Sequence, residues 1–187
     1  MRPAVFLDRD GVLNEVRLED GVPHPPASMA ELEIVAEAHT ATKRLREAGF
    51  VLLITTNQPD VARGTADRAD VEELNEAVRA TLGIDHVYCC WHDGSGCGCR
   101  KPRPGMLLDS AADVDLDLAA SWVVGDRWVD IGAGGSAGTR TILLERSYSW
   151  EPSGGITPPA DLEPTARVST LSGAVTLIVR ASNRQSS

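Results

Sequence analysis

The sequence predicts an α/β protein in which helices cover both faces of a doubly wound, Rossmann-like parallel sheet. Short apolar runs typical of buried strands alternate with longer stretches whose apolar residues recur at helical spacing. Polar side chains gather just after these runs, at the strand ends where such sheets bind ligands. The 187 residues suit one domain with a sizeable core, so we expect a single domain over 1–187.

Five strands are predicted by apolar runs short enough to be buried on both sides of a sheet. They are residues 5–7, 50–54, 86–89, 122–124 and 141–144. The first predicted helix places Ala41 and Leu45 on one side and is followed by Gly49 as its stop, and Pro104 suits the start of the third. Glycines make the last stretch the weakest helix former. The predicted helices are residues 36–48, 67–82, 104–112 and 131–137.

A C-terminal extension is predicted over residues 147–187. Within it, 166–169 and 171–179 predict an edge strand and a terminal helix. Residues 147–164 and 181–187 lack such patterns and predict a loop and a frayed tail. The residue patterns that suggest chemistry lie before the extension, within 4–145.

The formal net charge of −9 and the isoelectric point near 4.9 argue against nucleic acid or an anionic membrane as the main partner. A small soluble ligand is favoured instead. No stretch approaches the ~20 apolar residues of a membrane-spanning helix, and the first residues lack an export-signal pattern, so we expect a cytoplasmic protein. Without a heptad run or a long exposed apolar helix, a monomer is the expected state.

Two aspartates one residue apart, Asp8 and Asp10, follow the first predicted strand and precede Gly11. Alternate residues of a strand point to the same side, so both carboxylates can face one small volume. Carboxylates that close repel each other, and a divalent cation is the usual remedy. By itself an Asp-x-Asp-Gly pattern is more often a turn or a calcium-like loop, so its chemistry depends on what lies nearby.

Three further strand ends carry polar motifs that would meet Asp8 and Asp10 on one rim of the sheet. They are Thr55-Thr56-Asn57-Gln58, Arg100-Lys101-Pro102 and Gly125-Asp126-Arg127-Trp128-Val129-Asp130. Taken singly, each has an ordinary explanation, because Thr and Asn form caps and turns, carboxylates favour helix starts, and lysines are commonly solvated. Together they supply what phosphoryl transfer requires: a carboxylate nucleophile, an acid/base, hydrogen-bond donors and a cation.

All four cysteines lie close together in the sequence, next to a histidine. A disulfide framework would tie distant segments, so metal binding explains the cluster better. Three thiolates and one imidazole form a suitable tetrahedral set for structural Zn²⁺, and a reactive-thiol site is the alternative. The expected zinc ligands are Cys90, His92, Cys97 and Cys99. Cys89 is expected to be a small buried apolar residue.

The order of these motifs resembles that of the haloacid dehalogenase-like hydrolases over residues 4 to about 145. The matching segments are Asp8-Arg9-Asp10-Gly11-Val12, Thr56-Asn57, Lys101, and Gly125-Asp126 with Asp130. More narrowly, the sequence is similar to the zinc-containing branch that includes heptose-1,7-bisphosphate phosphatases and histidinol-phosphate phosphatases. The segments that carry this similarity are Cys90-x-His92, Cys97-x-Cys99, Arg100-Lys101-Pro102-x-Pro104-Gly105-Met106 and Asn57-Gln58-Pro59-Asp60-Val61-Ala62-Arg63-Gly64.

The resemblance implies a Mg²⁺-dependent phosphomonoester hydrolase that works through an aspartyl-phosphate. Asp8 is then the nucleophile, and Asp10 protonates the leaving alkoxide and later activates water. Thr56 and Asn57 are expected to hydrogen-bond the phosphoryl oxygens, and Lys101 is expected to neutralise charge as the transition state forms.

Two metal ions are expected. The magnesium ligands would be Asp8, the backbone carbonyl of Asp10, and Asp126. Asp130 would support metal-bound water or orient Lys101. The zinc site already has four protein ligands, so we expect it to shape its loop and take no part in the chemistry.

Members of this superfamily often recognise substrates with a separate cap domain, but the intervals 11–55 and 58–99 leave no room for one. We therefore expect an open rim, with Arg63 and Arg100 as candidates for binding a second anionic group. As alternatives, Arg63 anchors its own loop and Arg100 stacks near the zinc site.

The implied substrate is a small phosphorylated metabolite. The resemblance favours the 7-phosphate of D-glycero-D-manno-heptose 1,7-bisphosphate, followed by histidinol phosphate or another small sugar phosphate. A catalytically silent module that binds a phosphorylated ligand is an alternative of a different class. The presence of both candidate catalytic aspartates, Asp8 and Asp10, argues against that alternative.

Overall fold

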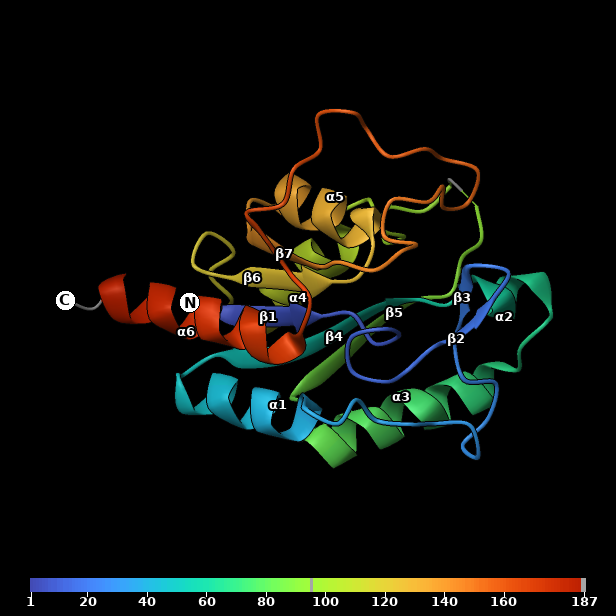
Figure 1. The fold of residues 1–187 in the computed structure, drawn as a ribbon, viewed down its shortest axis with the longest axis horizontal. Coiled ribbons are helices and arrows are strands. Elements are labelled where there is room, and N and C mark those ends of the chain that lie inside the picture. The colour runs from blue at the N-terminus through green and yellow to red at the C-terminus, as the bar shows by residue number, and fades with distance from the viewer. Residues whose placement is uncertain (95, 186–187) are drawn as a thin grey trace.

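The computed structural model describes residues 1–94 and 96–185, in which the main sheet lies between two layers of helices (Figure 1). The strands of this sheet are β1 (Ala4–Leu7), β4 (Val51–Asn57), β5 (His86–Cys90), β6 (Trp122–Gly125), β7 (Arg140–Leu144) and β8 (Ala166–Val168). Their order is β5-β4-β1-β6-β7-β8, and each pairing is parallel. The predicted doubly wound parallel sheet is therefore confirmed.

Strand β1 is at the centre of the fold. It pairs with β4 on one side and β6 on the other, and its residues are fully buried. Val5 and Leu7 pack into one core, whereas Ala4 and Phe6 pack into the core on the opposite face. The residues that follow β1 therefore emerge in the middle of the sheet edge, with loops from neighbouring strands on either side.

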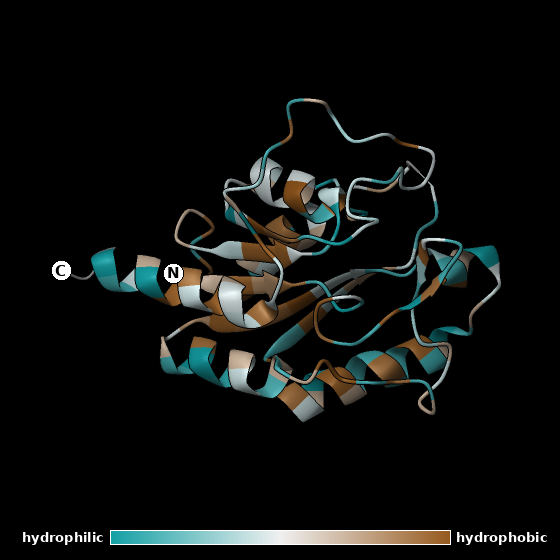
Figure 2. Ribbon diagram, viewed as in Figure 1, coloured by the Kyte–Doolittle hydropathy of each residue, from teal (hydrophilic) through white to brown (hydrophobic). Residues whose placement is uncertain are grey.

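The helices form two layers. They are α1 (Ala38–Glu47), α2 (Pro59–Arg63), α3 (Arg68–Leu82), α4 (Gly105–Val114), α5 (Trp128–Ala137) and α6 (Leu171–Gln185). One face of the sheet is covered by α1, α3 and α6, and the other by α4 and α5 (Figure 1). Hydrophobic residues concentrate on the strands that these helices enclose (Figure 2). No helix in the described ranges is long and apolar enough to cross a membrane.

The predicted strands and helices are present with shifted ends. Helix α5 begins before residue 131, where the sequence predicts its start. Its first turn is stabilised because the Asp130 carboxylate accepts a hydrogen bond from the Arg127 backbone amide at 3.2 Å. Helix α6 continues to residue 185, so the predicted tail is helical up to that point, and residues 186–187 lie outside the described residues. Ala181 packs against the core and favours this continuation.

Two short elements are not predicted from the sequence. Strands β2 (Arg17–Glu19) and β3 (Val22–His24) form an antiparallel hairpin. They are joined by Asp20 and Gly21, whose φ angles of 50° and 81° are typical of tight Asp-Gly hairpin turns. The other element, α2, is a short helix with Pro59 in its first turn. In neither element do apolar residues recur at the spacing of a buried strand or helix, because both elements lie at the surface.

The C-terminal extension packs onto the domain through β8, beside β7, and through α6, beside α1. The Glu37 carboxylate accepts hydrogen bonds from the backbone amides of Leu171 (2.9 Å) and Ser172 (3.0 Å), at the start of α6. Burial alone raises the pKa of Glu37, but these hydrogen bonds outweigh burial and hold the pKa below its usual value. Ionised Glu37 therefore favours docking of α6.

Candidate active site

One open cleft of about 700 Å³ lies at the carboxyl ends of β1, β4 and β6 and beside the loop that follows β5. The four motifs that the sequence predicts to converge all contribute to its lining. These residues include Asp8, Asp10, Thr56, Asn57, Lys101 and Asp126. The parallel sheet thus brings side chains from distant parts of the chain to one rim.

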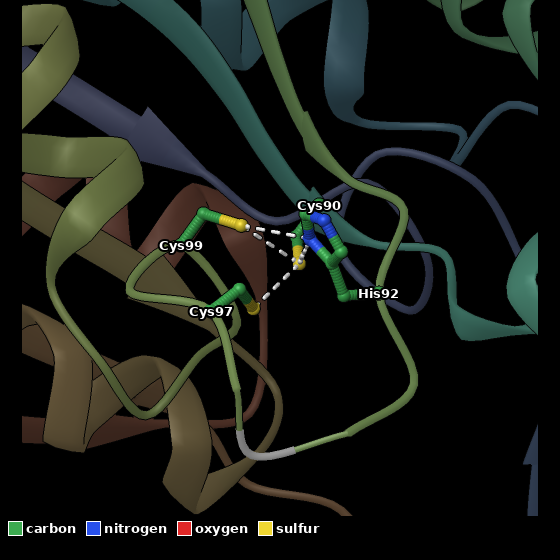
Figure 3. Close-up of side chains that lie close together, drawn as sticks. All are labelled: Cys90, His92, Cys97 and Cys99. Carbon is green, nitrogen blue, oxygen red and sulfur yellow. Dashed lines mark hydrogen bonds between the residues drawn. The ribbon is translucent and has the colours of Figure 1, made fainter.

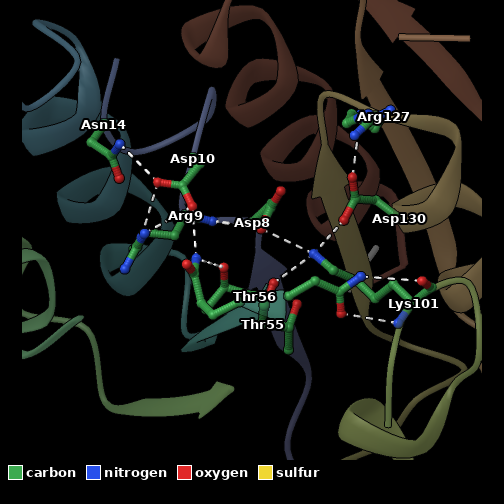
Figure 4. Close-up of polar contacts among 11 residues, drawn as sticks. Asp8, Arg9, Asp10, Asn14, Thr55, Thr56, Lys101, Arg127 and Asp130 are labelled. Atoms are coloured by element: carbon green, nitrogen blue, oxygen red, sulfur yellow. Dashed lines mark hydrogen bonds and ion pairs between the residues drawn. The ribbon is translucent and has the colours of Figure 1, made fainter. Parts of the chain in front are cut away.

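Lys101 is buried beside the cleft and links two carboxylates (Figure 4). Its Nζ atom lies 2.9 Å from Asp8 Oδ1 and 2.5 Å from Asp130 Oδ1. It also donates a hydrogen bond to the Thr55 carbonyl at 2.7 Å. Burial alone lowers the pKa of Lys101, but Asp130 and Asp8 outweigh burial and raise the pKa above its usual value. Lys101 is therefore a fixed positive charge, held by Asp130 next to Asp8.

The carboxylates around Lys101 are difficult to ionise together. Burial raises the pKa of Asp8 to about 7; Lys101 opposes this shift, and Asp130 and Asp10 add to it. Burial also raises the pKa of Asp126, and the negative charges of Asp8 and Asp130 contribute. One lysine therefore does not balance the negative charge of this group, and a bound cation would favour the ionised forms.

The donor set fits a hard divalent cation. Asp8, Asp126 and Asp130 each offer a carboxylate oxygen within 4.8 Å of the other two. Asp126 Oδ1 is buried and has no hydrogen-bond partner among residues 1–94 and 96–185. An unpaired buried carboxylate oxygen is costly, and Mg²⁺ prefers such ligands. Asp8 and Asp126 are the residues that would hold it, whereas Asp130 is engaged by Lys101, and ligation by the Asp10 carbonyl stays a prediction.

Asp10 is fixed by three neighbouring side chains (Figure 4). Arg9 donates through Nε to Oδ1 at 3.0 Å and through Nη2 to Oδ2 at 2.9 Å. Asn14 donates to Oδ1 at 3.0 Å and Gln58 to Oδ2 at 2.8 Å. Arg9 is itself buried and donates to Asn75 of α3 at 2.7 Å. The sequence alone does not predict these positioning residues, because an Arg next to an Asp gives no sign of its burial or of its bidentate contact.

Thr56 and Asn57 differ in what their side chains contact. Thr56 accepts a hydrogen bond from Gln58 at 2.8 Å and lines the cleft. The Asn57 amide donates to the Lys101 carbonyl and accepts from the Lys101 amide, both at 3.1 Å. The two hydrogen bonds of the Asn57 side chain hold the backbone that carries Lys101, and binding of a phosphoryl oxygen by Asn57 stays a prediction.

The four expected zinc ligands converge at the end of β5 and in the loop that follows it (Figure 3). Cys90 Sγ lies 3.1 Å from Cys99 Sγ, 3.8 Å from Cys97 Sγ and 3.6 Å from His92 Nδ1. Ligands of a tetrahedral Zn²⁺ at about 2.0–2.3 Å from the ion are roughly 3.3–3.8 Å apart. Two of these spacings lie in that range and the one between Cys90 and Cys99 is slightly shorter, so the cluster fits zinc. Cys89 is outside the cluster, and burial raises the pKa of its thiol to about 12, which disfavours a reactive thiolate.

Replacing Cys99 by Ser is expected to release zinc and to lower stability. A structural zinc ion contributes directly to folding, so we expect a loss of at least about 2 kcal/mol in the free energy of unfolding, or roughly 4–8 °C in Tm. Metal analysis and thermal unfolding measure both effects. Cys89→Ser is the matched control, since Cys89 lies outside the cluster. A Cys99→Ser protein with one zinc per chain and an unchanged Tm would contradict the structural assignment.

Arg63 and Arg100 both line the cleft, but they differ in how free their guanidinium groups are to bind an anionic group. Arg63 donates to Asp60 at 3.1 Å and to Asp93 at 2.5 Å, and these contacts, chiefly the one with Asp93, raise its pKa. Its charge is therefore balanced, as expected if it anchors its loop. Arg100 donates to the His92 carbonyl at 3.0 Å and has no ion pair in the described part of the chain. Arg100 is thus the better candidate for an anion contact.

Further residues complete the walls of the cleft. Arg127 lines it together with residues 152–154 of the extension and residues 22–27 of the hairpin region. The Arg127 guanidinium donates to the carbonyls of Glu151 (3.4 Å) and Pro152 (3.2 Å), and its Nε is buried without a partner among the residues described. The positive charge of Arg127 is not paired with a carboxylate among the residues described, so the guanidinium can contact an anionic group in the cleft.

A family model described as HAD-hydrolase-like, for haloacid dehalogenase-like hydrolases, matches residues 98–170. A D-glycero-beta-D-manno-heptose-1,7-bisphosphate 7-phosphatase of Escherichia coli (strain K12) is 35% identical over 158 residues, which cover 78% of this chain and 80% of the relative. The protein of the same name from Haemophilus ducreyi is 33% identical over 159 residues, which cover 78% of this chain and 84% of the relative.

The fold is also similar to solved structures. A crystal structure of D,D-heptose 1,7-bisphosphate phosphatase from B. bronchiseptica, complexed with magnesium and phosphate, aligns with a TM-score of 0.76 and 30% identity. The alignment covers 96% of this chain and 99% of that one. The chain therefore belongs to the HAD-like hydrolases, in the family of the heptose-1,7-bisphosphate phosphatases, and it is a phosphatase that hydrolyses phosphomonoesters.

Proposed function

We propose that this phosphatase removes the 7-phosphate of a D-glycero-D-manno-heptose 1,7-bisphosphate. The observation that carries the proposal is the Asp8 carboxylate, which lies 2.9 Å from buried Lys101 in an open cleft. This cleft has arginines on its rim and is not covered by a cap domain in the described residues. The curated relatives that carry this activity in their names align across most of the chain.

The side chains support a two-step displacement. Asp8 attacks phosphorus, the bond between phosphorus and the C7 oxygen breaks, and Asp10 gives a proton to that oxygen. Asp10 then takes a proton from water, which attacks the aspartyl-phosphate and releases inorganic phosphate and free Asp8. Thr56 donates a hydrogen bond to a phosphoryl oxygen, and the positive charge of Lys101 offsets the negative charge that develops during both steps. Mg²⁺ held by Asp8 and Asp126 would supply further charge neutralisation.

Arg100 and Arg127 would bind the second phosphate of the substrate. Both line the cleft, and each keeps donors that no described carboxylate occupies. A guanidinium can bind phosphate through two parallel hydrogen bonds. Arg63 is less suited to this role because Asp60 and Asp93 already balance its charge.

The same proposal includes the metal ions, the location, the oligomeric state and the domain organisation of the enzyme. It binds catalytic Mg²⁺ and structural Zn²⁺, and it acts as a cytoplasmic monomer on a small phosphorylated metabolite. Residues 1–187 form a single domain, in which 147–187 extends the core that carries the motifs.

Phosphate release from a panel of substrates tests the proposal, with Mg²⁺ and after EDTA. The panel holds both anomers of heptose 1,7-bisphosphate, histidinol phosphate and several sugar monophosphates. We expect a heptose bisphosphate to be preferred. Arg100→Met should lower kcat/KM for the bisphosphate about 10–100-fold, with little effect on kcat/KM for monophosphates. Arg63→Met should lower kcat/KM for the bisphosphate less. Preference for histidinol phosphate, or no Mg²⁺-dependent release from any member, would contradict the proposal.

A further inference from the structure

We propose that Tyr148 is a positioning residue for Asp126, because it holds one carboxylate oxygen so that only the other is offered to a divalent cation. This inference rests on the proposed function, in which Asp126 holds Mg²⁺. Tyr148 lies in the C-terminal extension, outside each motif that suggests chemistry in the sequence. Its role is to orient Asp126, without touching the substrate.

The two oxygens of Asp126 have different surroundings. The Tyr148 hydroxyl donates to Oδ2 at 2.7 Å, and the two residues are only 3% and 2% exposed. Oδ1 is buried and has no hydrogen-bond partner within the described ranges. Asp126 lines the cleft, and one of its oxygens lies within 4.8 Å of a carboxylate oxygen of Asp8. A carboxylate held in this way presents a single oxygen to the place where the aspartates meet.

The backbone of Gly11 packs against Asp126 Oδ2, the oxygen that accepts the hydrogen bond from Tyr148. A Cβ atom at Gly11 would overlap Asp126 Oδ2 and would lie 3.0 Å from the Tyr148 hydroxyl oxygen. The backbone at Gly11 therefore packs directly against the hydrogen-bonded pair, with a φ angle of +82° that glycine tolerates well. Between Gly11 and Tyr148, Oδ2 is enclosed, and Oδ1 is the oxygen left for a cation.

The backbone around Tyr148 is tied to the loop that it orients. Ser149 Oγ donates to the Asp126 carbonyl at 2.6 Å. The Trp128 amide donates to the Ser149 carbonyl at 2.9 Å, and Trp128 Nε1 donates to the Glu151 carbonyl at 2.9 Å. These bonds fix the extension against the loop after β6, so the Tyr148 hydroxyl is held in place before any cation binds. Partners that orient a ligand in this way are a recurrent part of metal sites.

Tyr148→Phe removes the hydroxyl but keeps the ring. We expect the Kd for Mg²⁺ to rise about 10–100-fold, as is usual when the partner of a metal ligand is lost. The kcat at saturating Mg²⁺ should change little, because Tyr148 does not contact the substrate. Calorimetric titration of Mg²⁺ into the zinc-containing, magnesium-free protein measures the affinity directly. The Mg²⁺-dependent rise in Tm gives a second measurement that works even for a variant of reduced stability.

Tyr88→Phe is the matched control. Tyr88 also donates to an aspartate, Asp113, at 2.9 Å, but neither residue lines the cleft, so Mg²⁺ affinity should be unchanged. Asp126→Asn should abolish the titration signal and so identify the site. A Tyr148→Phe protein with wild-type Mg²⁺ affinity would overturn the inference, even if its Tm were lower.

The substrate takes no part in these titrations, so they test Tyr148 even if the substrate panel disproves the proposed function. A wild-type protein that binds no Mg²⁺ would contradict this inference together with the magnesium assignment. A wild-type protein that binds Mg²⁺ but releases phosphate from no member of the panel would contradict only the proposed function.

Discussion

The Asp8→Asn variant should lose turnover almost completely while keeping its fold. An amide cannot form the aspartyl-phosphate, so phosphate release should fall by at least about 10⁴-fold. Stability without metal should not fall, because burial raises the pKa of Asp8 to about 7 and its ionised form is unfavourable in the folded state. Relative to the wild-type protein, the variant should therefore gain stability. This gain should be full above pH 7 and should vanish as the pH falls toward 4, which is about the pKa of Asp8 in the unfolded chain. Phosphate assays at saturating Mg²⁺ and thermal unfolding measure the two effects.

Asp109→Asn is the matched control for this substitution. Asp109 is exposed on α4 and does not line the cleft, so the control should keep wild-type kcat and Tm. Substantial Mg²⁺-dependent turnover by Asp8→Asn would contradict the nucleophile assignment. Loss of the fold would instead show that Asp8 is needed for the structure.

The central sheet could be predicted because burial on both faces makes each strand apolar along its own sequence. Residues 4–7 are apolar at each position since both faces of β1 are covered, and the same holds for much of β4 and β6. The hairpin of β2 and β3 has no such apolar pattern, because its strands are largely exposed and Leu18 is 50% exposed. Its one local signal is Asp20-Gly21, a turn sequence whose meaning depends on the flanking residues.

The candidate site could be predicted in its residue types but not in its contacts. Aspartates, a lysine and hydroxyls at strand ends are visible in the sequence, because the fold fixes where strand ends meet. The partners of each side chain are set by residues far along the chain. The Asn57 amide binds backbone atoms of Lys101, 44 residues away, and Tyr148 binds Asp126, 22 residues away. No local sequence pattern indicates such pairs, which is why neither the contact between Asn57 and Lys101 nor the one between Tyr148 and Asp126 is predicted.

Lys101→Met should cause a large loss of both stability and activity. Methionine keeps much of the length of the side chain, but Asp8 and Asp130 lose their shared cation and the Thr55 carbonyl loses a donor. Removing one partner of a buried ion pair typically costs about 3–5 kcal/mol, which we expect at pH 8. Loss of the positive charge beside the phosphoryl group should also lower kcat by roughly 10²–10³-fold.

The loss of stability should become smaller as the pH falls. Lys101 lowers the pKa of Asp8 in the wild-type protein, so without it the pKa of Asp8 lies above 7 and the carboxyl is mostly protonated at pH 6. A protonated Asp8 no longer carries an uncompensated buried charge, and urea unfolding at pH 6 and pH 8 should show the difference. Lys43→Met is the control, because this exposed lysine lies 3.9 Å from Glu47 and should contribute less than about 1 kcal/mol. Wild-type stability of Lys101→Met at pH 8 would show that the lysine does not balance the two aspartates, and wild-type turnover would remove it from the catalytic site.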